Sequence, residues 1–475
     1  MLRIKKWAGL CLGVLLFCAT AIAQVTTGQV SGTVADSTGA VIPGATVTLR
    51  NVETGITRTV QTDAAGVYKA PQLSLGMYEI TAESAGFQTI VRTGIEMTVG
   101  RQAVVDFAMQ VGAVAEVITV TGEAPLLETT NATVADLVTE NQMRELPLNG
   151  RSFTDLTAIQ PGVVTDLGIP SGVFQGGGRM VIGGARPQQS LYLLDGTDIA
   201  SPYSNVAPVS VMNQTLGVDT IREFTVIQNN YGAQYGRAIG GIVNAVTRSG
   251  TNEIHGSLFE FLRNEKLDAR NYFDDPNEKI PPFKRNQFGG TIGGPIVKDN
   301  TFYFFSYEGL QQVFGTTDAF GNVLSNETRL GQITGCPSGM STCTKEQRII
   351  SKTVTVNPDI RPIINLIPLA PEGQLYRNDG IQEYNGTRKQ PGREHYYMFR
   401  IDQRLSDNDS LFGRWTSDYS SKELPDAQFL PNLTGPTGTH TSTDDDGFYS
   451  YLTVEWTRIM SPSVLNVIRA GFARN

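Results

Sequence analysis

The strict alternation of apolar and polar side chains in the C-terminal half constrains the fold of this chain more than any other feature. Between residues 448 and 457, one parity holds Phe, Ser, Leu, Val and Trp, and the other holds Tyr, Tyr, Thr, Glu and Thr. Residues 303, 305 and 307 share a similar aromatic face. Successive side chains of a strand point to opposite faces. Strands with one apolar and one polar face are typical of a transmembrane β-barrel.

The spacing of these segments also fits a barrel. Seven strands are predicted, over residues 254–263, 284–296, 301–309, 394–405, 410–418, 447–459 and 463–475. Short turns alternate with long polar loops at residues 264–283, 310–393 and 419–446, as periplasmic turns alternate with extracellular loops. Unpaired backbone groups in hydrocarbon cost several kcal/mol each, and plugged outer-membrane transporters use about 22 strands. We therefore expect residues 251–475 to be the N-terminal part of a barrel, in a truncated chain.

The N-terminus has the pattern of a secretory signal peptide. Arg3, Lys5 and Lys6 precede an apolar run that is shorter than the roughly 20 residues needed to span a bilayer. Small residues at positions 21 and 23 predict cleavage between Ala23 and Gln24, so that residues 1–23 are removed. The mature protein is expected to be exported.

Two cysteines remain after the leader. Cys336 and Cys343 are separated by six residues, between Gly, Pro, Ser and Thr. Disulfides persist in an oxidising compartment, so we predict that the two cysteines pair. Reactive thiols and metal ligands are the alternatives, but no His, Asp or Glu lies between the two cysteines.

Several functional classes find little support. The net charge is −8, from 38 Lys+Arg and 46 Asp+Glu, and no basic run suggests nucleic-acid binding. The three histidines are far apart, which disfavours a zinc site. No nucleophile–base motif is present, and the glycine-rich stretches do not match a nucleotide-binding loop. We expect no enzyme activity and no cofactor.

Residues 24–112 contain short alternating runs separated by turn residues, which predicts a small antiparallel β-sandwich. Four motifs occur in order, at residues 32–36, 41–47, 62–68 and 76–87 (GTVAD, VIPGATV, TDAAGVY and GMYEITA followed by Gly86 and Phe87). They resemble the carboxypeptidase regulatory-like family. The resemblance implies a prealbumin-like, carbohydrate-binding-like fold without catalysis. Tyr68, Tyr78 and Phe87 could form a sugar-stacking platform, although such positions normally close a core.

Residues 113–127 contain a short β-prone segment followed by a polar linker. The segment is interpreted as an unpaired strand that could add to the sheet edge of another protein. The alternative is an ordinary edge strand of the sandwich.

Residues 128–250 carry a series of motifs in one order. They are LPLNGRSF at 146–153, GARP at 184–187, YLLDG at 192–196, IREFTV at 221–226, YGAQYG at 231–236 and GGIVNAVT at 240–247. These motifs resemble the plug domain of TonB-dependent outer-membrane receptors, most closely the Oar-like branch. The chain is therefore expected to be mainly β, with a sandwich, a mixed α/β plug and the first strands of a barrel. Residues of the pairs at 144–145 and 222–223, and Asp195, could form ion pairs with the barrel wall or be solvated.

The resemblance implies a coupling box of six residues in the linker segment. It comprises Glu116, Val117, Ile118, Thr119, Val120 and Thr121, with Val117 where the family more often has Thr. A TonB-type periplasmic energy-coupling protein would bind this box. The resemblance further implies import of an extracellular ligand, which could be a carbohydrate, a siderophore or a peptide. An outer-membrane adhesion, assembly or export protein with a glycan-binding sandwich is the alternative.

The expected location is the outer membrane, in contact with its lipid, with the sandwich in the periplasm and the long loops outside the cell. The loop between residues 310 and 394 contains the cysteine pair and a proline-rich stretch. Long loops are uncommon unless functional or disordered. We expect this loop to contribute to ligand selectivity.

Overall fold

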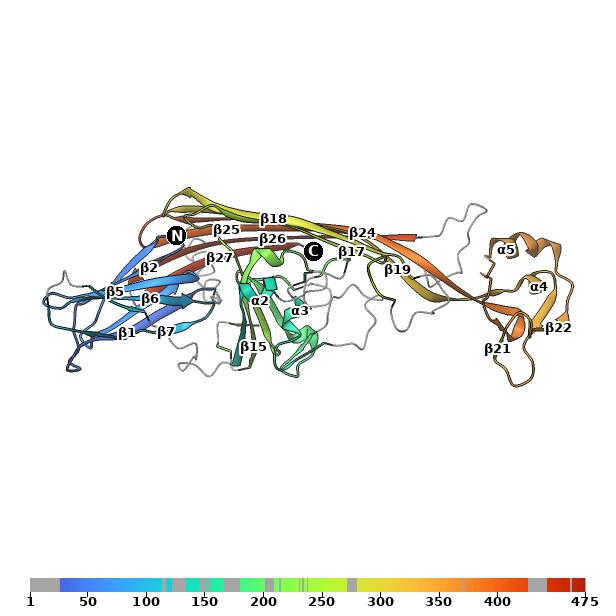
Figure 1. The fold of residues 1–475 in the computed structure, drawn as a ribbon, viewed down its shortest axis with the longest axis horizontal. Coiled ribbons are helices and arrows are strands. Elements are labelled where there is room, and N and C mark those ends of the chain that lie inside the picture. The colour runs from blue at the N-terminus through green and yellow to red at the C-terminus, as the bar shows by residue number, and fades with distance from the viewer. Residues whose placement is uncertain are drawn as a thin grey trace, which may run out of the picture.

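The computed structural model describes most of the chain from residue 26 onward, in three successive parts (Figure 1). The described residues are 26–112, 117–121, 134–145, 151–152, 154–165, 180–200, 209–212, 215–229, 231–232, 235–236, 238–270, 280–367, 369–370, 372–425, 442–461 and 464–474. The predicted leader and its cleavage site at Ala23 and Gln24 lie outside this range. None of the helices within it is long and apolar enough to cross a membrane.

The first part is a β-sandwich. Its strands are β1 (Gly28–Asp36), β2 (Thr46–Asn51), β3 (Thr57–Gln61), β4 (Val67–Leu73), β5 (Gly76–Glu83), β6 (Thr89–Met97), β7 (Gln102–Val104), β8 (Phe107–Met109) and β9 (Val117–Thr121). One sheet has the order β4-β1-β7, with β8 also on β1, and the other has the order β3-β2-β5-β6-β9. Alternate residues of β1 and β2 are buried between the sheets. This alternation is the period of two that the sequence predicts.

One expectation about the sandwich needs correction. The sandwich is not wholly antiparallel, because β1 pairs in parallel with both β7 and β8. This close approach explains Gly32, where an added Cβ would lie 1.9 Å from the carbonyl oxygen of Val105. Of the two alternatives for the aromatic side chains, core closure rather than a sugar platform is the one that forms at Tyr68 and Tyr78, which are only 1% and 3% exposed. They close the core, and the Tyr68 hydroxyl donates to the Val105 carbonyl oxygen (2.6 Å).

The second part is the plug. Its elements are β10 (Val134–Val138), α2 (Glu140–Glu145), α3 (Thr154–Thr157), β11 (Val163–Thr165), β12 (Met180–Ile182), η1 (Pro187–Gln189), β13 (Leu191–Leu194), β14 (Thr197–Asp198), η2 (Val218–Thr220), β15 (Ile221–Asn229) and β16 (Ile242–Thr247). The main sheet has the order β10-β15-β16-β13-β14. Every residue of β13 and β16 is buried. Strands covered on both faces need continuous apolar runs rather than alternation.

The third part is a curved sheet of long antiparallel strands. They are β17 (His255–Asn264), β18 (Phe283–Val297), β19 (Thr301–Leu324), β24 (Ile381–Arg404), β25 (Asp409–Pro425), β26 (Ser442–Ser461) and β27 (Val464–Arg474), paired in that order. Phe448, Leu452 and Val454 are exposed on the outer face, whereas Tyr451 and Thr453 are buried against the plug. The seven predicted strands are thus confirmed within the described residues, and the alternation predicted for residues 448–457 is confirmed in β26.

The predicted loop between residues 310 and 394 is wrong in its extent. β19 and β24 stay paired from Thr301 and Gln403 to Leu324 and Ile381, so the loop begins only after Leu324. Backbone pairing needs no apolar alternation, and the aromatic pattern therefore marked a shorter strand than the one that forms. Residues 325–380, called the loop insertion below, contain α4 (Asn326–Arg329), β20 (Gln332–Gly335), β21 (Thr342–Cys343), β22 (Ile349–Thr353), η3 (Pro358–Ile360), α5 (Arg361–Leu366), β23 (Tyr376–Arg377) and η4 (Asn378–Gly380).

The sandwich and the loop insertion lie at opposite ends of the long strands (Figure 1). The short turns of the long sheet are at the sandwich end, where Asp299 contacts Asn252 and the Arg404 side chain donates to the carbonyl oxygen of Thr57. The loop insertion extends from the other end of the β19–β24 hairpin. The plug packs against one face of the sheet between these two ends.

Candidate functional site

Asp195 lies in the two-residue loop of the β13–β14 hairpin of the plug. Leu194 pairs with Thr197, and Asp195 and Gly196 between them both have positive φ (47° and 72°). Asp-Gly is the dipeptide that such a tight turn favours, because Asp tolerates the left-handed region and Gly adopts it freely. The hairpin therefore projects a carboxylate from the end of a buried strand. The Asp195 residue is only 1% exposed.

The plug itself holds this carboxylate in one orientation. The Thr247 amide donates to Asp195 Oδ1 (2.9 Å), and the Thr247 hydroxyl donates to Oδ2 (2.8 Å). Thr247 ends β16, which runs parallel to β13 in the same sheet. Residues of the plug alone therefore hold both carboxylate oxygens of Asp195.

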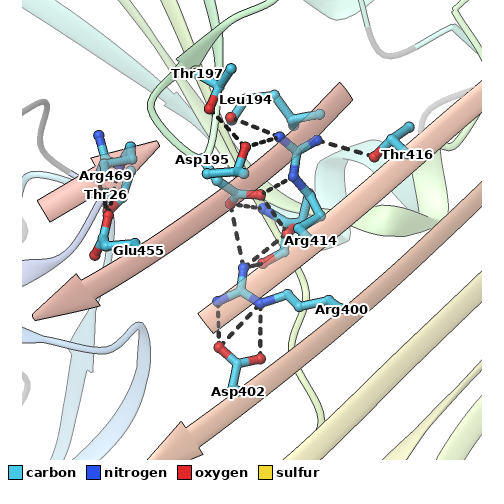
Figure 2. Close-up of polar contacts among 12 residues, drawn as sticks. Thr26, Leu194, Asp195, Thr197, Arg400, Asp402, Arg414, Thr416, Glu455 and Arg469 are labelled. Carbon is cyan, nitrogen blue, oxygen red and sulfur yellow. Dashed lines mark hydrogen bonds and ion pairs between the residues drawn. The ribbon is translucent and has the colours of Figure 1, made fainter. Parts of the chain in front are cut away.

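Two arginines of the long sheet meet this carboxylate (Figure 2). Arg414 Nε lies 2.9 Å from Asp195 Oδ2, and Arg400 Nη1 lies 3.4 Å from Oδ1. Arg400 and Arg414 face each other directly on β24 and β25. Two guanidinium groups side by side repel, so their burial requires an anion between them. We call Asp195, Arg400, Arg414 and Asp402 the plug–barrel ion cluster.

Other donors of the two arginines make hydrogen bonds. Arg414 Nη2 donates to Thr453 Oγ1 (2.6 Å) and to the Leu194 carbonyl oxygen (3.2 Å). Arg400 Nη2 donates to Asp402 Oδ1 (2.8 Å). Two carboxylates therefore balance two guanidinium groups, a condition under which buried charges are tolerated. One of the two alternatives for Asp195, an ion pair with the barrel wall, is the one that forms.

A second group of buried carboxylates contacts the plug farther from the sandwich. Glu308 accepts from the Gly217 amide (2.8 Å), and Glu394 accepts from the Ser210 hydroxyl (2.6 Å). Among the described residues, Glu394 Oε1 and Asp418 Oδ1 have no hydrogen-bond donor.

Within the described part of the chain, no group of three or more His, Cys, Asp or Glu side chains is arranged to hold a metal ion.

The sandwich is tied to the plug through polar contacts at two adjacent residues of β15. Arg222 makes two hydrogen bonds to Glu53, both 2.9 Å long, and the Glu223 carboxylate accepts from the Val99 amide. Burial raises the pKa of Glu223 to about 7, although the Val99 hydrogen bond and the nearby Arg222 charge act in the opposite direction. The pair at 222–223 thus faces the sandwich rather than the barrel wall. The side chains at 144–145 lie outside the described residues.

A cavity of about 230 Å³ lies at the junction of the three parts. Its walls include Tyr78 of the sandwich, Arg222 of the plug, and Arg404 and Phe412 of the long sheet. Leu75, Val99 and Val246 form only a small apolar cluster across the interface of sandwich and plug. The attachment of the sandwich therefore depends on a few discrete contacts rather than on a continuous core.

The predicted coupling box is described only in part. Glu116 lies outside the described residues, and Val117, Ile118, Thr119, Val120 and Thr121 form β9. The interpretation of this segment as unpaired is wrong. β9 pairs in parallel with β6, from Thr89 and Val117 to Thr93 and Thr121. It is an edge strand of the sandwich, which was the alternative, because its β-prone backbone finds a partner in the same chain.

Cys336 and Cys343 form a disulfide in the loop insertion, with Cα atoms 5.6 Å apart. Both residues are buried against Tyr376, and the Cys336 amide donates to Asn378 Oδ1 (2.9 Å). The disulfide therefore joins the end of β20 to β21, and β21 in turn pairs with β23 near the end of the insertion. Residues that face outward nearby include Ile349 and Ile350, which are about half exposed.

Sequence reasoning missed the partners of Asp195 and of Arg222. Arg400, Arg414 and Glu53 carry no local signature, and each contacts a residue more than 150 positions away. The sequence did contain a signal for the two arginines. Each lies on the polar face of a predicted strand, next to an aromatic residue of the opposite face. A charged side chain at such a position requires a buried partner.

Comparisons with known families divide the chain in the same way. Residues 29–110 match a carboxypeptidase regulatory-like domain, residues 126–242 a TonB-dependent receptor plug domain, and residues 246–475 an outer membrane β-barrel domain. The TonB-dependent transporter Oar of Myxococcus xanthus is 28% identical over 308 residues, which cover 62% of this chain and 27% of that protein. The ferrienterobactin receptor of Escherichia coli K12 is 26% identical over 319 residues, covering 63% and 39%.

Among solved structures, a ferric enterobactin receptor mutant from Pseudomonas aeruginosa, in complex with enterobactin, is similar with a TM-score of 0.44 and 14% identity. The match covers 73% of this chain and 41% of that one. The chain thus spans well under half the length of these relatives.

Proposed function

The chain belongs to the TonB-dependent receptors of the outer membrane, and from that premise we propose that it binds an extracellular ligand and imports it past its plug. A TonB-type periplasmic protein supplies the energy of the inner-membrane proton gradient by pulling on the coupling box. The receptor performs no chemistry on the ligand.

The observation that carries this proposal is the plug–barrel ion cluster. Removing one partner from a buried ion pair costs about 3–5 kcal/mol, because a charge is left without compensation. A plug held by Asp195 between two buried arginines stays in place at rest. Opening a path therefore requires work from outside the receptor, as an energised transporter needs and a passive anchor does not.

The ligand is proposed by class only. Carbohydrates, siderophores and peptides are candidates, and relatives named as siderophore or ferrienterobactin receptors add weight to the siderophore class. The loop insertion supports a role in recognition, because it is compact, stapled by a disulfide and farthest from the sandwich. For the adhesion alternative with a glycan-binding sandwich, Tyr68 and Tyr78 offer no sugar-stacking surface, since both are buried in the core.

Deleting Glu116–Thr121 tests the energy coupling. Receptor without this segment should still bind ligand at the cell surface, because the loop insertion is untouched, but should lose energised uptake. The periplasmic domain of the coupling protein should pull down the intact receptor and not the deletion variant. Uptake at the normal rate in the deletion variant would rule out this function.

A further inference from the structure

The coupling strand is held by the sandwich rather than by the plug. β9 pairs with β6 over five residues in register, and it is the last strand of the sheet β3-β2-β5-β6-β9. Its other edge carries no strand among the described residues. An edge strand presents unpaired backbone N–H and C=O groups, which a strand of another protein can pair with.

The strand that holds β9 is fixed directly to the plug. β6 ends at Met97, and two residues later the Val99 amide donates to the Glu223 carboxylate. Val99 is itself buried, beside Val246 of β16. Movement of β6 therefore acts on the centre of the plug sheet through a very short connection.

The opposite side of the same sandwich sheet is fixed to the neighbouring plug residue. Glu53 follows β2 and binds Arg222 through two hydrogen bonds, each 2.9 Å long. The side chains are 22% and 30% exposed, so the pair is only partly screened by solvent. The Glu53 carbonyl oxygen also accepts from the Asn252 amide (3.0 Å), between plug and first long strand.

β15, which carries both attachment residues, leads to the ion cluster. Ile221 of β15 pairs with Thr247 of β16, and Thr247 holds both oxygens of Asp195. A continuous series of strand pairs and hydrogen bonds therefore connects β9 to Arg400 and Arg414. Such a series shows a physical connection, whereas transmission along it must be measured.

We propose that the N-terminal sandwich is the coupling element of the receptor: the energy-coupling protein adds a strand to the free edge of β9, and the pull passes through β6 and the Glu53 and Val99 contacts to plug strand β15. This inference rests on the proposed function, because it requires that β9 be the coupling box. Its partner is an extended periplasmic strand. The connecting segment between β9 and β10 is not the sole route of the force.

A cross-link between β9 and β6 tests where the partner binds. Val91 and Thr119 are directly paired, so Val91→Cys with Thr119→Cys joins the strands when oxidised. Because the partner uses the other edge, the oxidised receptor should still be pulled down by the coupling domain and should still import ligand. Loss of binding on oxidation, with binding retained in both single-cysteine variants, would mean that β9 must leave the sandwich and would overturn the proposal.

Weakening the sandwich–plug contact tests the route of the force. Glu53→Gln and Arg222→Met should each retain ligand binding and pull-down by the coupling domain, and each should lose most energised uptake. Glu83→Gln, at an exposed carboxylate of β5, is the matched control and should import normally. Normal uptake in both interface variants would overturn the proposal. If the unmodified receptor itself fails to bind the coupling domain, the proposed function fails instead.

Discussion

The packing of the sandwich against the plug, called sandwich docking below, should depend on pH through the carboxyl group of Glu223. Burial in the interface raises its pKa from 4.5 to about 7, so the docked state holds the proton more tightly than the undocked state does. Docking is therefore strongest below the undocked value of about 4.5. It weakens as pH rises between the two values and is constant above about 7. At 1.36 kcal/mol per pKa unit, the interval corresponds to roughly 3 kcal/mol.

Hydrogen exchange at the Val99 amide measures this effect, since that amide donates to Glu223 and exchanges when the interface opens. After correction for intrinsic exchange rates, protection should fall by about 10- to 100-fold between pH 5 and pH 8, because each 1.4 kcal/mol is a factor of ten. Glu223→Gln retains an acceptor oxygen for Val99 and carries no charge, so its protection should not vary with pH. Glu83→Gln should behave as the unmodified receptor does. Equal protection at both pH values in the unmodified receptor, or the same fall in Glu223→Gln, would refute the reasoning.

Three further outcomes are expected. Arg414→Met should destabilise the plug by about 3 kcal/mol, because it strips the carboxylate of Asp195 of its nearest cation; adding Asp195→Asn should recover part of this loss, and urea titration followed by hydrogen exchange of the plug strands measures both. A single Cys336→Ser or Cys343→Ser change should loosen the loop insertion by about 2–3 kcal/mol, the value for a short closed loop, and should speed its proteolysis on intact cells. Asp359→Cys should react with a membrane-impermeant thiol reagent on intact cells, because we expect the loop insertion to lie outside the cell. Labelling only after the outer membrane is broken would mean that the loop insertion lies on the periplasmic side.

The sequence predicts the long strands well because their side chains alternate between lipid and plug. The same rule fails at the end of β19 and β24 that lies away from the sandwich. Residues 311–324 and 381–393 lack the aromatic pattern and were assigned to a loop, yet their backbones remain paired. The partner of β9 was missed for a related reason. A parallel pairing between residues 89–93 and 117–121 leaves no mark on either segment, because backbone hydrogen bonds do not depend on side-chain type.

The sequence indicates the motif that contains Asp195, but it does not indicate which residues Asp195 contacts. Asp195 stands in a tight Asp-Gly turn that the sequence shows directly, and an ion pair with the barrel wall was one of two options for it. The identity of its partners depends on which residues of β24 and β25 face the plug and on their register. Arg222 illustrates the limit, because its position in the plug gives no indication that Glu53, in a different domain, binds it.

The direct opposition of Arg400 and Arg414 has a consequence for how the receptor assembles. Without the plug, the barrel wall would hold two guanidinium groups against each other on paired strands, with Asp402 as the ion-pair partner of Arg400. Docking of the Asp195 hairpin reduces the penalty of their repulsion and also gives Arg414 Nη2 the carbonyl oxygen of Leu194 as an acceptor. The plug would thus help the strands that surround it to pair. We expect β24 and β25 to reach their final register only after the Asp195 hairpin has docked against them. We therefore expect barrel assembly and plug docking to occur as one cooperative event rather than as two steps in sequence.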